Sequence, residues 1–211
     1  MTLLSEAWLA PPPLGPTVIA GAGPEALMEI LRPEASLALW ARPLPPPLRG
    51  QAAALAARPF EAVAEGPPEA ALASLSCALP LALRHDMLAL SLLFCGIAGR
   101  EGLRIRLEAL AGDGCRFFHA DAVGLRLLCT YHGAGTQWLP LPGGARAARA
   151  LDPATCPAPE QAAPGTVLLM KGEGHPGHAG RGLIHRSPPA PPGAGARLLL
   201  CLDEPGRIPL P

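Results

Sequence analysis

The sequence predicts an α+β protein, in which helices of the first half pack on an antiparallel barrel or a jelly-roll pair of sheets. Of the 211 residues, 49% are hydrophobic and only 16% are charged, which is enough apolar surface to form a core. An apolar stretch over residues 81–98 has the length of one helix and is followed by Gly99. After residue 100 the hydrophobic period changes from helical to two, and short strands follow without an intervening helix.

The first half of the chain predicts short helices and one strand. A helix is predicted over residues 24–31, where a proline occupies the first position. Residues 36–40 (SLALW) favour a short strand, and residues 47–57 favour a second helix. We expect residues 1–80 to form a helical and irregular region that packs on a core formed by residues 81–211.

The second half predicts a series of strands. Residues 102–110 (GLRIRLEAL) alternate apolar and charged side chains, which is typical of a strand with one buried face. An Ala- and Pro-rich connection over residues 143–165 is expected to be a lid or a disordered loop. Further short strands, bounded by Gly and Pro, are expected over residues 124–131, 136–141, 166–170, 182–185 and 197–202.

Charge and composition exclude several classes of function. Basic and acidic residues number 17 each and form no block of like charge, which disfavours binding to nucleic acid or to an anionic membrane surface. The N-terminus lacks the basic start and the apolar length of a signal peptide. The most apolar run, residues 87–99, is shorter than the ~20 residues that cross a bilayer, so we expect a core helix. Six cysteines without a C-x-x-C pair suggest buried, reduced thiols in a cytoplasmic protein.

Three side chains of the second half form a candidate metal site. His119 and Asp121 are separated by one residue, so on an extended segment both point to the same face. His185 follows on another expected strand. Two histidines and one carboxylate are the ligands that hold non-haem Fe(II) with open positions for other molecules. If the strand that begins at Arg197 lies beside the strand of His185, this guanidinium binds a carboxylate co-substrate through two hydrogen bonds.

The same residues carry a resemblance to known families. The order H-x-D, then His, then Arg resembles that of the Fe(II)/2-oxoglutarate dioxygenases, whose fold is an antiparallel double-stranded β-helix of the jelly-roll type. The strings FHADAVGLRLLCTYHGAGTQWLP, TVLLMKGE, GLIHRSPP and RLLLCLDEP resemble a bacterial family of proteins, domain of unknown function 1826. This second resemblance is close over residues 80–205 and reaches the N-terminal part only in outline, through SLALWARPLP.

The resemblance implies roles for particular residues. Fe(II) would be held by the two histidines and the aspartate, and 2-oxoglutarate would be anchored by Arg197, with Tyr131 donating its hydroxyl to the same carboxylate. Many dioxygenases of this kind have a small hydroxyl residue two positions after the arginine, where this chain has Leu199. Members of the 1826 family are often associated with zinc-homeostasis GTPases of the metallochaperone type, which implies such a partner.

Zinc is the alternative metal. In a non-catalytic zinc-binding protein of bacterial metal homeostasis, the same His/Asp/His set would hold zinc, with His175 or His178 closing the shell. These two histidines form an H-x-x-H motif that would also build a tetrahedral zinc site with His185 or Cys156, or else lie in a solvated loop. Cys115 is either a further ligand or a buried thiol. A third alternative is a cupin-like binding module that has lost its metal.

Other polar residues have structural interpretations. Arg126 and Arg186 are expected to form ion pairs with Asp203 or Glu204, and Trp138 is expected to pack in the core or to roof the pocket. The sequence therefore predicts an Fe(II)-dependent oxygenase that uses 2-oxoglutarate and acts on a small molecule or a protein. It leaves the substrate and the physiological metal undefined.

Overall fold

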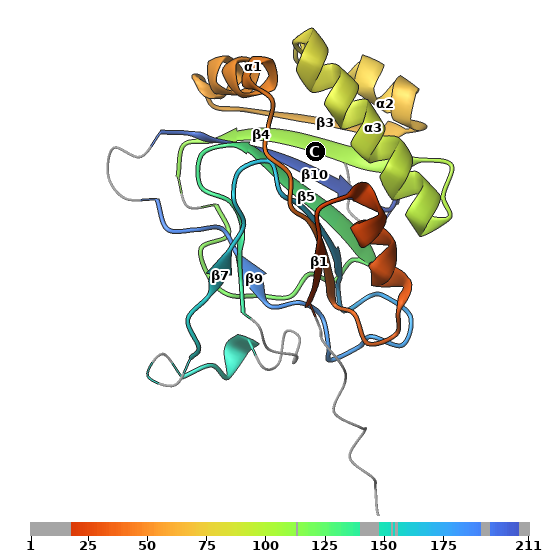
Figure 1. Ribbon diagram of the computed structural model, residues 1–211, viewed down its shortest axis with the longest axis vertical. Helices are drawn as coiled ribbons and strands as arrows, with labels where there is room; N and C mark the ends of the chain where they lie inside the picture. Colours follow the sequence, from red (N-terminus) through yellow and green to blue (C-terminus); the bar gives the residue numbers. More distant parts are fainter. Residues whose placement is uncertain are drawn as a thin grey trace, which may run out of the picture.

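Three neighbouring antiparallel strands form the middle of the large sheet at the centre of the molecule (Figure 1). Their side chains alternate between the two faces of this sheet. The strands are β4 (Leu103–Leu110), β5 (Leu125–His132) and β10 (Arg197–Asp203). The computed structural model describes residues 18–112, 114–139, 148–152, 154, 156–190 and 195–206. In these residues the chain has a mixed α+β fold, as the sequence predicts.

The central strands belong to a seven-stranded sheet with the order β1-β2-β8-β5-β10-β4-β3. Strands β1 and β2 are parallel, and every other neighbouring pair is antiparallel. The outer strands of this sheet are β1 (Val18–Gly21), β2 (Leu37–Trp40), β3 (Phe60–Gly66) and β8 (Val167–Lys171). Residues 18–66 therefore contribute three strands to the same sheet as the later part of the chain.

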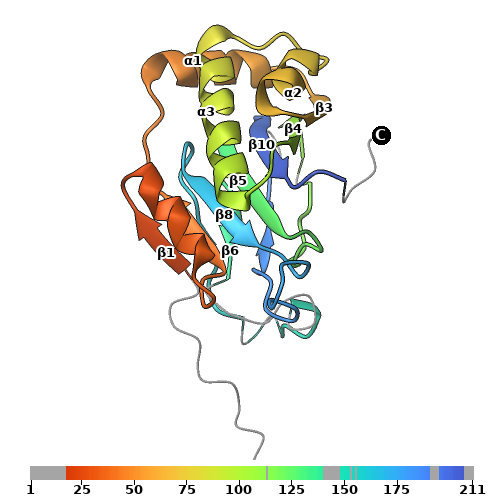
Figure 2. The ribbon, with the colours of Figure 1, turned by 90° about the vertical axis from the view of Figure 1, so that its right-hand side faces the viewer.

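Helices cover one face of the large sheet (Figures 1 and 2). The helix α3 packs on it through Leu83, Met87, Leu90 and Phe94, none of which is more than 1% exposed. By length and composition α3 would suffice to cross a membrane, and in the structure one side of it is buried against the sheet while Leu81 and Leu92 are exposed. The helical elements are η1 (Pro24–Leu31), a 3-10 helix, and α1 (Pro46–Ala56), α2 (Pro68–Ser74) and α3 (Leu81–Ala98).

A second, three-stranded antiparallel sheet lies across the other face of the large sheet. Its order is β7 (Glu160–Gln161), β6 (Gln137–Trp138) and β9 (His185–Arg186). A smaller apolar cluster, which includes Trp138, Leu168 and Leu199, joins the two sheets. Trp138 is thus in the core, as predicted.

Most predicted elements are confirmed, and the differences concern short strands. Of the strand expected over 136–141, residues 140–141 lie outside the described residues, and the described part contains β6; the strand expected over 182–185 contains only the start of β9. The sequence pattern does not predict β1, β3, β7 and α2. Of the expected lid or disordered loop, residues 143–147, 153 and 155 lie outside the described residues, and residues 160–161 form β7.

A buried polar cluster joins α3 to the sheet. Asp86 of α3 accepts hydrogen bonds from both Nη atoms of Arg42, at 2.6 and 2.7 Å, and from the hydroxyl of Tyr131, at 2.7 Å. The Nε of Arg42 donates to the carbonyl of Gly165. Burial raises the pKa of Tyr131 well above its usual value, so its hydroxyl remains a donor. This cluster connects four segments that are distant in the sequence.

Replacing Asp86 by alanine is expected to destabilise the protein by about 3 kcal/mol, because the Arg42 charge and the Tyr131 hydroxyl lose their acceptor in a largely buried place. Denaturant unfolding of the metal-free protein measures the loss. The control is Glu29→Ala, which breaks an exposed pair with Arg32 and should cost less than about 0.5 kcal/mol. Equal losses for both variants would contradict the importance of the cluster.

Candidate metal centre

The three predicted ligands lie where the segment before β5 meets strand β9. His119 and His185 form an antiparallel bridge, in which the amide of each donates to the carbonyl of the other, at 3.0 and 2.9 Å. The bridge places the two imidazole rings side by side, with centroids 4.5 Å apart. Asp121 follows two residues after His119, and its carbonyl accepts from the amide of Glu173 at 2.7 Å. The backbone thus fixes all three residues.

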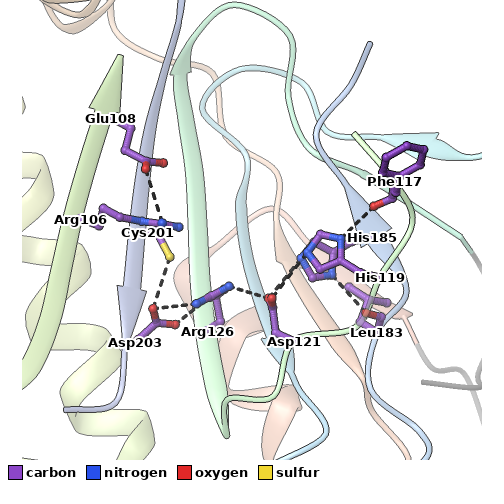
Figure 3. Close-up of polar contacts among 10 residues, drawn as sticks. All are labelled: Arg106, Glu108, Phe117, His119, Asp121, Arg126, Leu183, His185, Cys201 and Asp203. Atoms are coloured by element: carbon purple, nitrogen blue, oxygen red, sulfur yellow. Dashed lines mark hydrogen bonds and ion pairs between the residues drawn. The ribbon is translucent and has the colours of Figure 1, made fainter. Parts of the chain in front are cut away.

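The side chains of these residues converge on one point (Figure 3). Oδ1 of Asp121 lies 3.5 Å from Nε2 of His119, and Oδ2 lies 3.2 Å from Nε2 of His185. The three ligand atoms are all within 4.8 Å of one another. Among the described residues, this is the one group of three or more His, Cys, Asp or Glu side chains that is close enough to hold a metal ion.

The chain holds both imidazoles in the tautomer that a metal needs. Nδ1 of His119 lies 2.9 Å from the carbonyl oxygen of Phe117, and Nδ1 of His185 lies 3.1 Å from that of Leu183. A carbonyl only accepts hydrogen bonds, so each Nδ1 carries a proton and donates it. In the neutral ring the lone pair is then on Nε2, the atom directed at Asp121.

Electrostatics keep Asp121 ionised. Burial alone would raise the pKa of this carboxyl. In the metal-free protein a ring that carries a second proton, on Nε2, donates it to Asp121, and these hydrogen bonds from His119 and His185, with the charges of His185 and Arg126, outweigh burial. The pKa of Asp121 is therefore held well below its usual range. The hydrogen bond to Asp121 conversely raises the pKa of His119. The centre offers one anionic oxygen ligand and two nitrogen ligands, a set that suits Fe(II) and other transition metals.

A small cavity of about 140 Å³ lies beside the two histidines, between the sheets. The large sheet lines this cavity with the face that points away from the helices. Strands β4 and β5 contribute charged side chains, and β5 and β10 contribute apolar ones. Glu108 has a raised pKa because of its burial. The sequence does not predict a role in a site for the cavity residues of β4, although the alternation in 102–110 places the charged ones on the face that points away from the core. The polar residues that line the cavity include Arg106, Glu108, Arg126, Thr136, Arg186 and Ser187.

Arg197 lies at the start of β10, on the same face of the strand as Leu199, but it is not among the residues that line the cavity. The strand β10 pairs with β4 and β5 and not with β9, the strand of His185, so the expected pairing of these two strands is wrong. The Nε of Arg197 donates to the carbonyl of Ala134 at 2.6 Å. Its two Nη atoms are buried, and within the described residues neither has a hydrogen-bond partner. Burial lowers the pKa of Arg197, although the nearby charge of Glu108 opposes this change. A buried guanidinium with unused donors is a site for an anion.

Tyr131 does not join Arg197. The two residues lie on opposite faces of the large sheet, because Tyr131 belongs to the apolar cluster that packs under the helices. Its hydroxyl donates to Asp86 and not toward the metal ligands. The expected role requires Tyr131 and Arg197 to bind one carboxylate together. The structure does not bring these two side chains together.

The other candidate ligands lie apart from the centre. Nε2 of His178 is 3.1 Å from the hydroxyl of Ser36, and the side chains of His175 and Cys156 are not in the metal-binding group. Cys115 lines the cavity but is also outside that group. Among the described residues, a fourth protein ligand for a closed zinc shell is thus lacking.

The expected ion pairs are confirmed for one arginine only. Arg126 pairs with Asp203, as expected. Arg186 instead donates to the amide oxygen of Gln137 at 2.9 Å and lies over the ring of Phe118. The carboxylate of Glu204 pairs with Arg100.

Comparison with known proteins gives a family and several distantly similar structures. The model of the family described as "Protein of unknown function (DUF1826)" matches residues 21–203. No curated protein matches the chain.

Among solved structures, the dioxygenase for auxin oxidation from rice is 17% identical, with a TM-score of 0.47, over 88% of this chain and 81% of that one. The 2-oxoglutarate complex of dioxygenase for auxin oxidation 1 from Arabidopsis thaliana is 13% identical, with a TM-score of 0.47, over 92% and 94%. AviO1 from Streptomyces viridochromogenes Tue57 is 17% identical, with a TM-score of 0.46, over 89% and 97%. Likeness at this level does not establish a shared activity.

Metal affinity is expected to rise with pH. A proton on Nε2 of His119 competes with the metal, and the hydrogen bond to Asp121 raises the pKa of this histidine, so the competition extends to higher pH than for an ordinary imidazole. Titration with Co(II) should give a dissociation constant that falls about tenfold per pH unit while one proton is released. In His119→Ala the metal should bind far more weakly. A wild-type dissociation constant that is independent of pH would contradict this assignment.

Proposed function

The chain belongs to the DUF1826 family of proteins of unknown function, and we propose that it is a non-haem Fe(II)-dependent oxygenase that uses 2-oxoglutarate. The observation that carries the proposal is the centre itself. Two imidazoles present Nε2 with Nδ1 held by backbone carbonyls, and one ionised carboxylate lies between them. Three ligands on one side of a metal leave positions for other molecules.

His119, Asp121 and His185 would hold the iron. When bound there, Fe(II) supplies a centre that binds dioxygen and a chelating co-substrate and makes oxidation of a C–H bond possible. The chain positions the ligands before any metal arrives, because the bridge between the two histidines and the hydrogen bond from Glu173 are backbone contacts. Little reorganisation is then needed on binding.

Arg197 would anchor the co-substrate. Its two Nη atoms form a fork that matches the two oxygens of a carboxylate, and a buried fork without partners favours an anion strongly. Leu199 occupies the position where many such oxygenases carry a hydroxyl, so the arginine would hold the carboxylate without that second donor. The cavity of about 140 Å³ that Leu199 lines would hold the co-substrate, with Arg197 reaching it from the same face of β10.

The substrate would approach from the other side of the histidines. A larger groove of about 620 Å³ is lined by Phe117, Phe118 and Arg186, which adjoin the two histidine ligands in the sequence. We also propose that the two sheets that face each other across the centre are a double-stranded β-helix. In support, the ligands lie between these sheets, as the resemblance to the dioxygenases implies.

The first experiment is anaerobic reconstitution with Fe(II), followed by titration with 2-oxoglutarate. A visible charge-transfer band of the iron chelate is expected for the wild type and not for a His119→Ala, Asp121→Ala variant, because that variant keeps a single metal ligand of the three. Absorption spectroscopy measures the band. Zinc retained stoichiometrically by the purified protein, together with no band after iron loading, would contradict the proposal and favour the zinc-binding alternative.

Arg197→Leu is expected to weaken 2-oxoglutarate binding at least about thirtyfold, or about 2 kcal/mol, while the metal content stays near that of the wild type. The reason is the loss of a buried fork of donors, which leucine does not replace. The matched control is Tyr131→Phe, on the opposite face of the sheet, which should leave 2-oxoglutarate affinity unchanged. If 2-oxoglutarate binds Arg197→Leu as tightly as the wild type, another residue anchors it.

A further inference from the structure

Arg126 joins the candidate metal centre to the large sheet (Figure 3). Its Nε and Nη2 donate to the two carboxylate oxygens of Asp203 at 2.6 and 2.8 Å. Its remaining terminal nitrogen, Nη1, lies 2.7 Å from Oδ2 of Asp121. One guanidinium therefore contacts two carboxylates, and one of these belongs to the candidate metal site.

The strand register fixes the position of this arginine. Arg126 and Asp203 lie directly opposite each other in the antiparallel pairing of β5 and β10, and both are buried. A fork held at two donors by one carboxylate has little rotational freedom, so its third donor points in a defined direction. That direction is toward Asp121, five residues before Arg126 in the sequence.

Stability alone does not account for this arrangement. A buried ion pair contributes little net stability, since removing two charges from water offsets most of their attraction. The pair nevertheless has a property that suits a metal site, because Arg126 and Asp203 together are neutral. Asp121 can thus keep its 2.7 Å ion-pair contact with Nη1 of Arg126 while its own negative charge is not neutralised by an unpaired cation. The metal would still meet a full carboxylate charge.

We propose that Arg126, oriented by Asp203, is a positioning residue that holds Oδ2 of Asp121, so that a metal receives one oxygen of this carboxylate. With the carbonyl of Asp121 fixed by Glu173, both the main chain and the side chain of the ligand are held. A carboxylate that offers one oxygen leaves one more coordination position open than a carboxylate that offers two. The inference rests on the proposed function in that it requires a metal at this centre.

The test measures metal binding without turnover, by titration of the metal-free protein with Co(II). Arg126→Met should weaken Co(II) binding about ten- to hundredfold, the usual effect of removing a residue that orients a ligand. It should also change the Co(II) ligand-field spectrum, which reports the coordination number. Arg126→Lys should recover part of the affinity, because the ammonium still reaches one carboxylate. The matched control is Arg100→Met, which breaks the exposed pair with Glu204 and should bind Co(II) like the wild type.

A second variant covers the case in which Arg126→Met does not fold. Asp203→Asn keeps the size of the side chain and one acceptor for Arg126, but it removes the compensating charge. The arginine charge then falls on Asp121, and Co(II) binding should again weaken about tenfold or more. Thermal unfolding of each metal-free variant verifies that it is folded.

The outcomes separate this inference from the proposed function. Co(II) binding by the wild type, with weaker binding and an altered spectrum in Arg126→Met or Asp203→Asn, supports the inference. Unchanged affinity and spectrum in folded variants would overturn it and leave the proposed function intact. Failure of the wild type to bind Co(II) or Fe(II) would overturn both. Metal binding without a 2-oxoglutarate band would contradict the proposed function alone.

Discussion

The central strands of the large sheet segregate apolar and charged side chains onto opposite faces, and the rest of the structure depends on this segregation. On one face, residues such as Ile105, Leu127 and Leu200 are fully buried under the helices. On the other face, Arg126 and Asp203 are also buried. Because burial removes these charges from water, they must be paired. The ion pair between Arg126 and Asp203 therefore follows from the burial of charged residues on this face of the sheet.

The same segregation specifies the register of the strands. A slip of one residue would move arginines into the apolar core, and each buried charge would cost about 5 kcal/mol. The register that results places Arg126 opposite Asp203 and puts Arg197 on their face. It also places Tyr131 on the helix side, where it binds Asp86. The strand register therefore places Arg197 and Tyr131 on opposite faces of the sheet.

An element of the fold is predictable when its own sequence has a clear hydrophobic period and clear end signals. The helix α3 and strand β4 have a clear period and clear ends, so both were found. Strand β3 was missed because its sequence, FEAVAEG, is weakly apolar, and only its pairing with β4 makes it a strand. The strands β6 and β9 are shorter than predicted for the same reason, since their ends depend on partners distant in the sequence.

The candidate site was predictable in its members but not in its geometry. The spacing of His119 and Asp121 placed both side chains together, whereas the approach of His185 depends on a two-residue bridge that spacing does not reveal. The position of Tyr131 was in principle readable, because it lies an even number of residues from Leu125 and Leu127, which face the helices. The family resemblance implies that Tyr131 donates to the carboxylate bound by Arg197. The alternation along β5 instead places Tyr131 on the helix side of the sheet, away from Arg197.

Strand β10 relates the two ends of the proposed site. Arg197 stands at its start and Asp203 at its end, both on the face of Leu199. The proposed anchor for a co-substrate and the proposed partner that orients Arg126 thus belong to one strand, and β4 and β5 pair with it on either side. An interior strand of a sheet has little freedom to slide or bend. The separation between Arg197 and Asp203 is therefore fixed by an interior strand, and Asp203 in turn holds Arg126 beside the candidate ligand Asp121, as a preorganised site requires.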